Sequence, residues 1–352
     1  MKRFKSIVAA GFAVLIAASY VMPAVTASAV SSAALSIVPK KNYVIEPGKS
    51  VKDTLIIRNL DDKIPLILTL RAVDFTFTDD GGTPKLMLDP NAPQTTWSLR
   101  PFMTIPKNVT VAPGSSKTVD MSVSIPAGHG AGSYYSAIVY SSGSGEGGNV
   151  GLSASGVTLA FVTIPGKVNE DLQLQKFGIY KPAKLSGEQG NFMFITTEMP
   201  QMIAYNLKNN GNVTEAPVGN ITLTNMFGQK QTIDDINPNR SLALIGQSRT
   251  FTSCIKLKTQ DVNFNNRTTK TADCESPSLW PGMYTATLDA FYGQNGNNTK
   301  EIIRTATFWY LPWWFILLVL VVLAVAGYYV WRIVRRIKYG RPGPRTKSSR
   351  QK

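Results

Sequence analysis

The chain has 352 residues, of which 37 are lysine or arginine and 22 are aspartate or glutamate, and its formal net charge is +15. Three basic residues lie within the first five positions and nine lie between Arg332 and Lys352, so the 25 that remain nearly balance the 22 acids of the central part. A nearly neutral body offers no basic surface to phosphates, and we therefore exclude nucleic acid as a partner.

The N-terminus has the pattern of an export signal. Lys2, Arg3 and Lys5 precede an apolar stretch from Ile7 to Ala18, and Ala27-Ser28-Ala29 is a small-residue cleavage pattern. We predict a signal peptide over residues 1–29 that directs the rest of the chain out of the cytoplasm. A second membrane anchor is the alternative, but the apolar core is short for a span.

Residues 35–307 have the pattern of β-strands. Apolar runs of five to nine residues, rich in Val, Ile, Thr, Phe and Tyr, are separated by clusters of Gly, Pro, Asn and Asp, without an amphipathic helix of useful length. Each half is long enough to bury its own core. We predict an all-β body of two tandem immunoglobulin-like β-sandwiches at residues 35–166 and 171–308, followed by a single transmembrane α-helix.

Three short signatures occur twice in the same order, which is the strongest evidence for two related domains. Each marks a strand end, a turn that leads into a strand, or the opening of a strand. The second copy is longer than the first by 18 residues between its second and third signatures. The pairs are Ile57-Arg58-Asn59 with Leu207-Lys208-Asn209, Gly114–Val119 with Gly246–Phe251, and Gly132-Ser133-Tyr134 with Gly282-Met283-Tyr284.

The two cysteines, Cys254 and Cys274, lie in that extra length. Because an exported body matures in an oxidising compartment, we predict a disulfide, which would close a loop of about 20 residues and contribute about 3 kcal/mol in the chain-entropy model. The bridge would staple an insertion near residues 259–278 onto a strand. Two free thiols are the alternative.

A segment rich in glycine and serine lies at residues 141–156. It is either a linker or a long hairpin loop. The stretch Val157–Ile164 that follows is too apolar to begin a domain unpaired, so we predict a loop whose flanking strands, Tyr134–Tyr140 and Val157–Ile164, pair with each other.

Candidates for catalysis and metal binding are few. His129 is the only histidine and lies in a glycine-rich stretch that predicts an exposed turn, so Ser-His-Asp sets and His-containing zinc sites lack their members. Asp79-Asp80-Gly81-Gly82 lacks the spaced acids of a calcium loop and predicts a hairpin turn. We predict no enzyme activity, no cofactor and no metal. A hydrolase that uses acids alone, such as Asp74, Asp79 or Asp80, is the least favoured alternative.

Trp97 and Phe102 flank a proline-rich connection in the first domain. Exposed aromatic rings there can stack on sugars, whereas packing in the core is the commoner use of such residues. We retain both as candidate partner-binding residues.

The C-terminal region predicts a single membrane span. Residues 312–331 hold no charge over 20 positions, and a helix of that length spans roughly 30 Å, the thickness of the hydrocarbon of a bilayer. The basic tail at 332–352 places this end in the cytoplasm and the body outside, with membrane lipid as a partner. The predicted interface residues are Trp309, Tyr310, Trp313 and Trp314 on the outer side, and Trp331, Arg332, Arg335 and Arg336 on the inner side.

The first domain also carries a pattern of turns and strands in Val44–Ser50 with Asn59, in Thr110–Val119, in Ser124–Pro126 and in Gly132–Tyr134. This pattern resembles immunoglobulin-like domains of the pilus-chaperone and sperm-protein type. With a second sandwich, one span and a basic tail, the whole chain is similar in architecture to the WxL-interacting surface proteins of Gram-positive bacteria. That resemblance implies a first domain associated with peptidoglycan, a second associated with host or partner proteins, and no catalytic residue.

We therefore predict a non-enzymatic, single-pass protein of the bacterial cell surface. Its extracellular body would bind a cell-wall polymer or another surface protein as an adhesin or scaffold. The anchor, the repeat and the shortage of catalytic groups motivate this prediction. The alternative is an accessory subunit of an envelope assembly or secretion complex, in which the span and the tail contact membrane partners.

Overall fold

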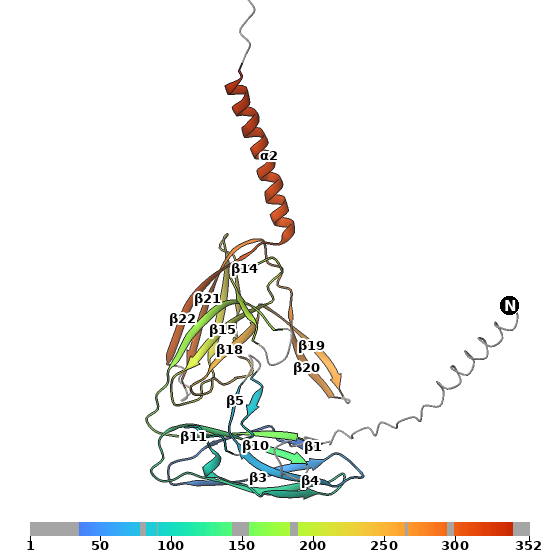
Figure 1. Ribbon diagram of the computed structural model, residues 1–352, viewed down its shortest axis with the longest axis vertical. Coiled ribbons are helices and arrows are strands. Elements are labelled where there is room, and N and C mark those ends of the chain that lie inside the picture. The colour runs from blue at the N-terminus through green and yellow to red at the C-terminus, as the bar shows by residue number, and fades with distance from the viewer. Residues whose placement is uncertain are drawn as a thin grey trace, which may run out of the picture.

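The computed structural model describes residues 35–77, 82–89, 91–142, 155–183, 189–264, 267–293 and 299–340. Within these ranges the chain forms two β-sandwich domains and one long helix, α2 (Trp313–Lys338), which leaves the second domain along the long axis of the molecule (Figure 1). The predicted all-β, immunoglobulin-like fold class is confirmed. The predicted signal peptide, the middle of the 141–156 loop, Asp79 and Asp80, and the end of the basic tail lie outside the described residues.

The first domain is a sandwich because its strands alternate apolar and polar side chains and bury one face. In the second strand of its first sheet, Leu55 and Ile57 point into the core, whereas Ile56 and Arg58 are exposed. This first sheet has the order β1 (Leu35–Ile37), β3 (Ser50–Asn59), β9 (Ser116–Ser124) and β7 (Met103–Thr104).

The second sheet of the first domain contains the predicted pair of strands around the 141–156 loop. These strands run antiparallel from the pair Gly132 and Ile164 to the pair Ser141 and Ser155, which confirms that the segment closes a hairpin. The sheet has the order β2 (Lys40–Val44), β11 (Ser155–Ile164), β10 (Gly132–Ser142), β4 (Leu66–Val73) and β8 (Asn108–Val111).

The second domain repeats this plan. In both domains a short edge strand runs parallel to the last strand of the domain, β2 beside β11 in the first and β14 beside β22 in the second. Apart from one edge strand in the first sheet of each domain, the equivalent strands follow in the same order, so the two domains are structural repeats. The two sheets are β13 (Asn191–Met193), β12 (Leu172–Lys181), β15 (Met202–Asn209) and β18 (Ser248–Cys254), and β14 (Ile195–Thr196), β22 (Lys300–Tyr310), β21 (Gly282–Tyr292), β16 (Val218–Asn225) and β17 (Lys230–Ile233).

A buried asparagine accounts for the first pair of repeated signatures. The Nδ2 of Asn209 donates to the carbonyl oxygens of Val213 and Ala243 at 2.7 and 3.0 Å, and its Oδ1 accepts from the N–H of Gly211 at 2.9 Å. Asn59 makes equivalent bonds to three carbonyl oxygens and to the N–H two residues later. One side chain thus binds backbone groups of two separate loops and joins those loops within the domain.

The second pair of signatures requires glycine at a turn. Gly114 and Gly246 have φ angles of 61° and 72°, in the left-handed region that L side chains rarely adopt. The N–H of Gly246 donates to the carbonyl oxygen of Asn209, and that of Gly114 donates to Asp61, two residues after the equivalent Asn59. The first and second signatures therefore meet in space in each domain.

We expect Asn209→Ala to lower the free energy of unfolding of the second domain by about 2–4 kcal/mol, because the Val213 carbonyl and the Gly211 N–H lose their partner and the Ala243 carbonyl keeps only the N–H of Glu215. Urea unfolding followed by circular dichroism measures the change. Asn210→Ala is the matched control, because Asn210 is the exposed neighbour. Equal midpoints for the two variants would contradict the role assigned to Asn209.

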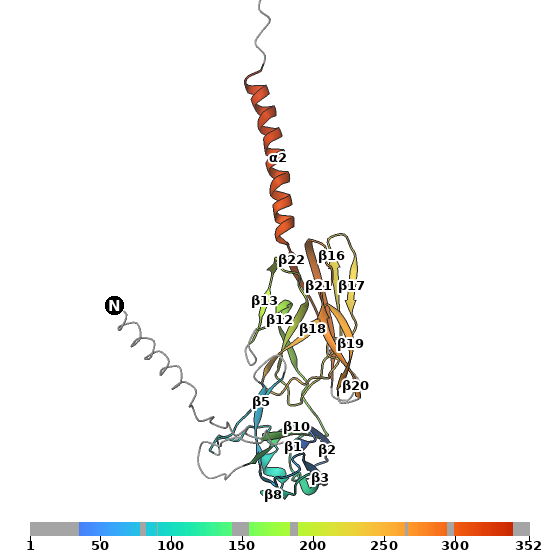
Figure 2. The ribbon, with the colours of Figure 1, turned by 90° about the vertical axis from the view of Figure 1, so that its right-hand side faces the viewer.

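Two hairpins and a short 3-10 helix lie outside the four sandwich sheets. Figure 2 shows β5 rising from the first domain toward the second, and Figure 1 shows β19 and β20 projecting beside the second domain. The hairpins are β5 (Phe75–Phe77) with β6 (Pro84–Leu86), and β19 (Lys256–Phe264) with β20 (Arg267–Glu275); the 3-10 helix η1 is Arg100–Phe102.

Candidate functional site

Helix α2 is the one helix among the described residues that is long and apolar enough to cross a membrane, and none of its side chains is buried by the rest of the chain. It begins after Pro312, where the missing N–H of proline costs nothing. Its 26 residues give a length of about 39 Å. The helix is longer than the predicted span because Arg332–Lys338 continue it, which places basic side chains in its last turns.

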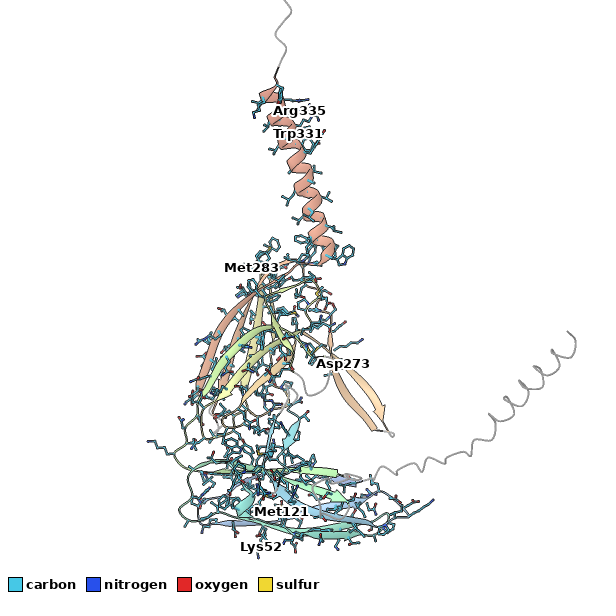
Figure 3. The ribbon with its side chains drawn as sticks, viewed as in Figure 1. Lys52, Met121, Asp273, Met283, Trp331 and Arg335 are labelled. Carbon is cyan, nitrogen blue, oxygen red and sulfur yellow. A yellow bond between two sulfur atoms is a disulfide. The ribbon has the colours of Figure 1, made fainter. Side chains whose placement is uncertain are left out.

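Aromatic side chains lie at both ends of this helix. Trp313 and Trp314 open it and are exposed. Near its other end the guanidinium of Arg335 lies 5.1 Å from the centre of the Trp331 ring, a cation–π contact (Figure 3). The placement of these residues at a membrane interface, together with Arg332 and Arg336, stays a prediction.

The predicted position of Tyr310 at the outer membrane interface is wrong. Its side chain is 5% exposed and belongs to the core of the second domain, together with Phe308. Strand β22 continues through Tyr310, so alternate residues 308 and 310 point inward. Only Trp309, which pairs with Ile195, keeps a partly exposed ring in this stretch.

The two domains meet through a third apolar cluster, which sequence reasoning missed. Tyr135, Ala137 and Val139 lie on the face of β10 that is turned away from the first-domain core, and they pack with Phe161 against Leu244 of the second domain. Strand β10 is therefore buried on both faces, which explains the continuous apolar run at residues 137–140. That run, in a sheet expected to face water on one side, was the available signal.

Hydrogen bonds reinforce this junction at one edge. The N–H of Ser133 donates to the carbonyl oxygen of Asn212 at 2.9 Å, and the Ser133 hydroxyl accepts from the N–H of Thr214 at 3.0 Å. The Asn212 side chain donates to the carbonyl oxygen of Ala131 at 3.0 Å. Because polar and apolar contacts act together, the domains form a continuous unit.

The β5–β6 hairpin is an arm that extends the first domain onto the second. The N–H of Phe77 donates to Oε1 of Gln247 at 3.3 Å. The guanidinium of Arg249 lies 4.7 Å from the centre of the Phe77 ring. Phe75, at the base of the arm, packs against Tyr135. The arm thus adds a second set of contacts between the domains, separate from the polar edge.

The two candidate partner-binding aromatics are placed apart. Trp97 stacks on Tyr135 with ring centres 6.0 Å apart and packs on the junction cluster. Phe102 packs on the core of the first domain and faces the ring of His129 at 4.6 Å. Both rings are partly covered, and a binding role for them stays a prediction. Across the described residues, no group of three or more His, Cys, Asp or Glu side chains could hold a metal ion.

Asp74 is a buried anchor rather than an open acid. It is 1% exposed, and its Oδ1 accepts from the hydroxyls of Ser98 and Ser136 at 2.6 and 3.1 Å. Its Oδ2 accepts from the N–H and the hydroxyl of Thr95, both at 3.2 Å. The carboxylate holds the loop that carries Trp97 onto β10, which leaves it without access to a substrate.

Glu215 is a buried acid of a different kind. It is 2% exposed, its Oε2 accepts from the N–H of Gly293 at 3.2 Å, and its Oε1 has no hydrogen-bond partner within the described ranges. Burial, and secondly the negative charge of Glu170, raise the pKa of Glu215 to about 7, although Gly293 and Lys300 act in the opposite direction. The loop that carries it also holds Asn212 and contacts the first domain.

The predicted disulfide is present. Cys254 ends β18 and Cys274 lies in β20, and their Cα atoms are 5.1 Å apart. The hairpin it holds spans Lys256–Glu275, and Lys256 and Glu275 form an ion pair at its base. The bridge therefore ties a hairpin that has its own sheet to the sandwich.

We expect the double variant Cys254→Ser with Cys274→Ser to lower the free energy of unfolding of the second domain by about 3 kcal/mol, since the bridge closes a short loop. Urea unfolding with and without reductant measures this. Reductant should shift the midpoint of the parent chain and leave that of the double variant unchanged. If reductant leaves the urea midpoint of the parent chain unchanged, the bridge does not stabilise the domain.

An open depression of about 450 Å³ lies on the first domain, at the end of the molecule farthest from α2 (Figure 3). One of its lining residues, Asp53, accepts from Lys41 at 2.5 Å and from the Tyr43 hydroxyl at 2.6 Å. Burial alone would raise the pKa of Asp53, but these hydrogen bonds and that from the Thr54 N–H lower it to about 2. The depression is lined by Lys52, Asp53, Thr54, Thr104, Asp120, Met121 and Ser122.

No family model matches the chain, and no curated protein matches it. Among solved structures, it is similar to the class 5 fimbriae chaperone CfaA, with 12% identity and a TM-score of 0.32 over 77% of this chain and 98% of the other. It is also similar to the E. coli chaperone DraB (13%, 0.31, 79% and 98%) and to the Pseudomonas aeruginosa CupB2 chaperone (8%, 0.29, 75% and 96%). Identities and TM-scores this low do not indicate what the chain does.

Proposed function

We propose that this chain is a non-enzymatic, single-pass protein of the bacterial envelope, anchored by α2, whose two sandwiches present a binding surface outside the cytoplasm. The observation that carries the proposal is α2 itself, a 26-residue apolar helix that none of the described residues covers. An apolar surface of this size is stable only in lipid or against a partner. The basic last turns of the helix favour its far end on the cytoplasmic side.

The shape of the body supports a presenting role. The junction cluster and the β5–β6 arm hold the two domains as one unit, so the depression on the first domain is kept at the end opposite the anchor. A cell-wall polymer or another surface protein is the partner that such an arrangement suits. The proposal includes the resemblance of this architecture to that of WxL-interacting proteins.

The anchor is tested by fractionating cells that produce the full chain. We expect the chain to stay with membranes after an alkaline carbonate wash and to be released by detergent. A variant in which Phe315–Trp331 is replaced by a Gly/Ser linker should appear in the soluble fraction. Release of the parent chain by carbonate would overturn the proposed span.

Binding is tested with the detergent-solubilised full chain as bait for cell-wall material and for envelope proteins. Retention that is lost on changing Lys52 and Asp120 in the depression would support presentation by the first domain. No retention of either material would sink the binding role. Replacing α2 with an unrelated apolar span separates a tether from a subunit of a membrane complex, because only a tether keeps its function.

A further inference from the structure

Exposed apolar side chains gather at the end of the second domain from which α2 leaves. They come from three separate segments: the connection into β14, the turn between β16 and β17, and the loop before β21. We call this set the rim. Its members and their exposed fractions are Phe194 (59%), Ile195 (55%), Met226 (53%), Phe227 (76%) and Trp280 (70%).

Strand pairing places all three segments at one end of the domain. The N–H of Trp309 donates to the carbonyl oxygen of Phe194, so the first segment lies beside the last residues of β22. Gly282 pairs with Tyr310, which brings the loop before β21 to the same level. The N–H of Met226 donates to the carbonyl oxygen of Met283, which Figure 3 shows at the helix end of the domain.

The turn and the loop also contact each other. A hollow of about 170 Å³ is lined jointly by the β16–β17 turn, through Asn225 and Gln229, and by Trp280. The Tyr284 hydroxyl donates to the carbonyl oxygen of Trp280 at 2.9 Å, which ties the loop to β21. The rim is therefore a surface built on the ends of the strands.

We infer that the rim rests in the headgroup layer of the membrane that α2 crosses. Only Leu311 and Pro312 separate β22 from α2, and the three Cα–Cα steps from Tyr310 to Trp313 span at most about 11 Å. The headgroup layer on each side of a bilayer is about 5–8 Å thick. With Trp313 at the boundary of the hydrocarbon, side chains level with Tyr310 lie within that layer or at its outer edge.

The chemistry of the rim suits this layer better than it suits water. A tryptophan has an apolar body and a polar edge, which favours the interface, and phenylalanine, isoleucine and methionine favour the acyl boundary. The charged side chains that flank the rim include Lys181 and Glu198, which neutralise each other in an ion pair at 2.7 Å. The second domain would thus stand on the bilayer with its strands upright. This inference rests on the proposed membrane span.

Quenching by brominated lipid tests the inference with the full chain in vesicles of phosphatidylcholine. The fluorescence of Trp280 is obtained as the difference between the parent chain and Trp280→Phe. We expect vesicles with brominated acyl chains to reduce this difference by about twofold or more, because the indole lies within the interface. The difference obtained with Trp97→Phe is the control and should not change, because Trp97 lies at the domain junction.

The variant Trp313→Phe with Trp314→Phe separates this inference from the span on which it rests. The fluorescence of Trp313 and Trp314 is obtained as the difference between the parent chain and this variant. If brominated lipid quenches this fluorescence but not that of Trp280, the membrane contact of the rim is overturned and the span is kept. Absence of quenching from both overturns the span. A second variant, Phe194→Ser with Phe227→Ser, should reduce the quenching of Trp280 while leaving that of Trp313 and Trp314 in place. Unchanged quenching of Trp280 in that variant would also overturn the role of the rim.

Discussion

Asp74→Ala is expected to lower the free energy of unfolding of the first domain by about 3–5 kcal/mol, because a buried carboxylate with four donors leaves them without an acceptor. The hydroxyls of Ser98 and Ser136 would stay buried and lose the acceptor of their O–H, although each still accepts from a backbone N–H. The loop that carries Trp97 would then be held on β10 mainly by its backbone bonds to Tyr135 and should loosen. Urea unfolding followed by circular dichroism measures the loss of stability.

Tryptophan emission reports the second consequence of this change. Trp97 stacks on Tyr135 in the junction, so its release to water should move its emission to longer wavelength. Asp120→Ala is the matched control, because Asp120 is an exposed acid of the same domain. Asp74→Asn should fall between the two, since the amide keeps one acceptor oxygen. An unfolding midpoint for Asp74→Ala equal to that of the control would show that the network is dispensable.

Glu215→Gln is expected to stabilise the second domain by about 2–3 kcal/mol at pH 8 and to change it little at pH 4. The folded chain holds the Glu215 proton with a pKa of about 7, whereas an unfolded chain releases it with a pKa near 4.3. The favourable contribution of the protonated acid is therefore complete below about pH 4.3 and is lost as the pH rises through 7. A glutamine side chain at this position is neutral at every pH, so the variant does not lose this contribution.

Thermal unfolding between pH 4 and pH 8 measures this dependence. The parent chain should lose stability across the range, and Glu215→Gln should lose less. Glu301→Gln is the control, because Glu301 is an exposed acid of the same domain. If the two variants show the same dependence on pH, the burial of Glu215 does not govern the stability of the domain.

The parts of the fold that depend on local chemistry could be predicted from the sequence. The turns after Asn59 and Asn209 need the same side chain for the same bonds, so the signatures recur and reveal the repeat. Glycine in a left-handed turn is equally local. The disulfide was predicted from the export signal expected at the N-terminus and from the position of the extra length in the second copy.

The parts that depend on distant segments could not be predicted. The junction joins Tyr135 to Leu244, more than one hundred residues along the chain, and nothing in either segment names the other. The pKa of Glu215 depends on the burial that the whole fold creates. Tyr310 was misplaced because an aromatic residue beside a span has two uses, and only the length of β22 decides that this one closes a core.

The short connection between β22 and α2 also determines how the molecule carries a mechanical load. A chain fixed by α2 and pulled through its first domain receives the force at Tyr310, in line with the strands. Strand β22 pairs with β21 over eleven residue pairs, and the bonds of such a ladder run across the strands. Under the proposed anchoring by α2, such a pull would shear these bonds together instead of opening them one by one, and the second domain would resist it along the full length of β22.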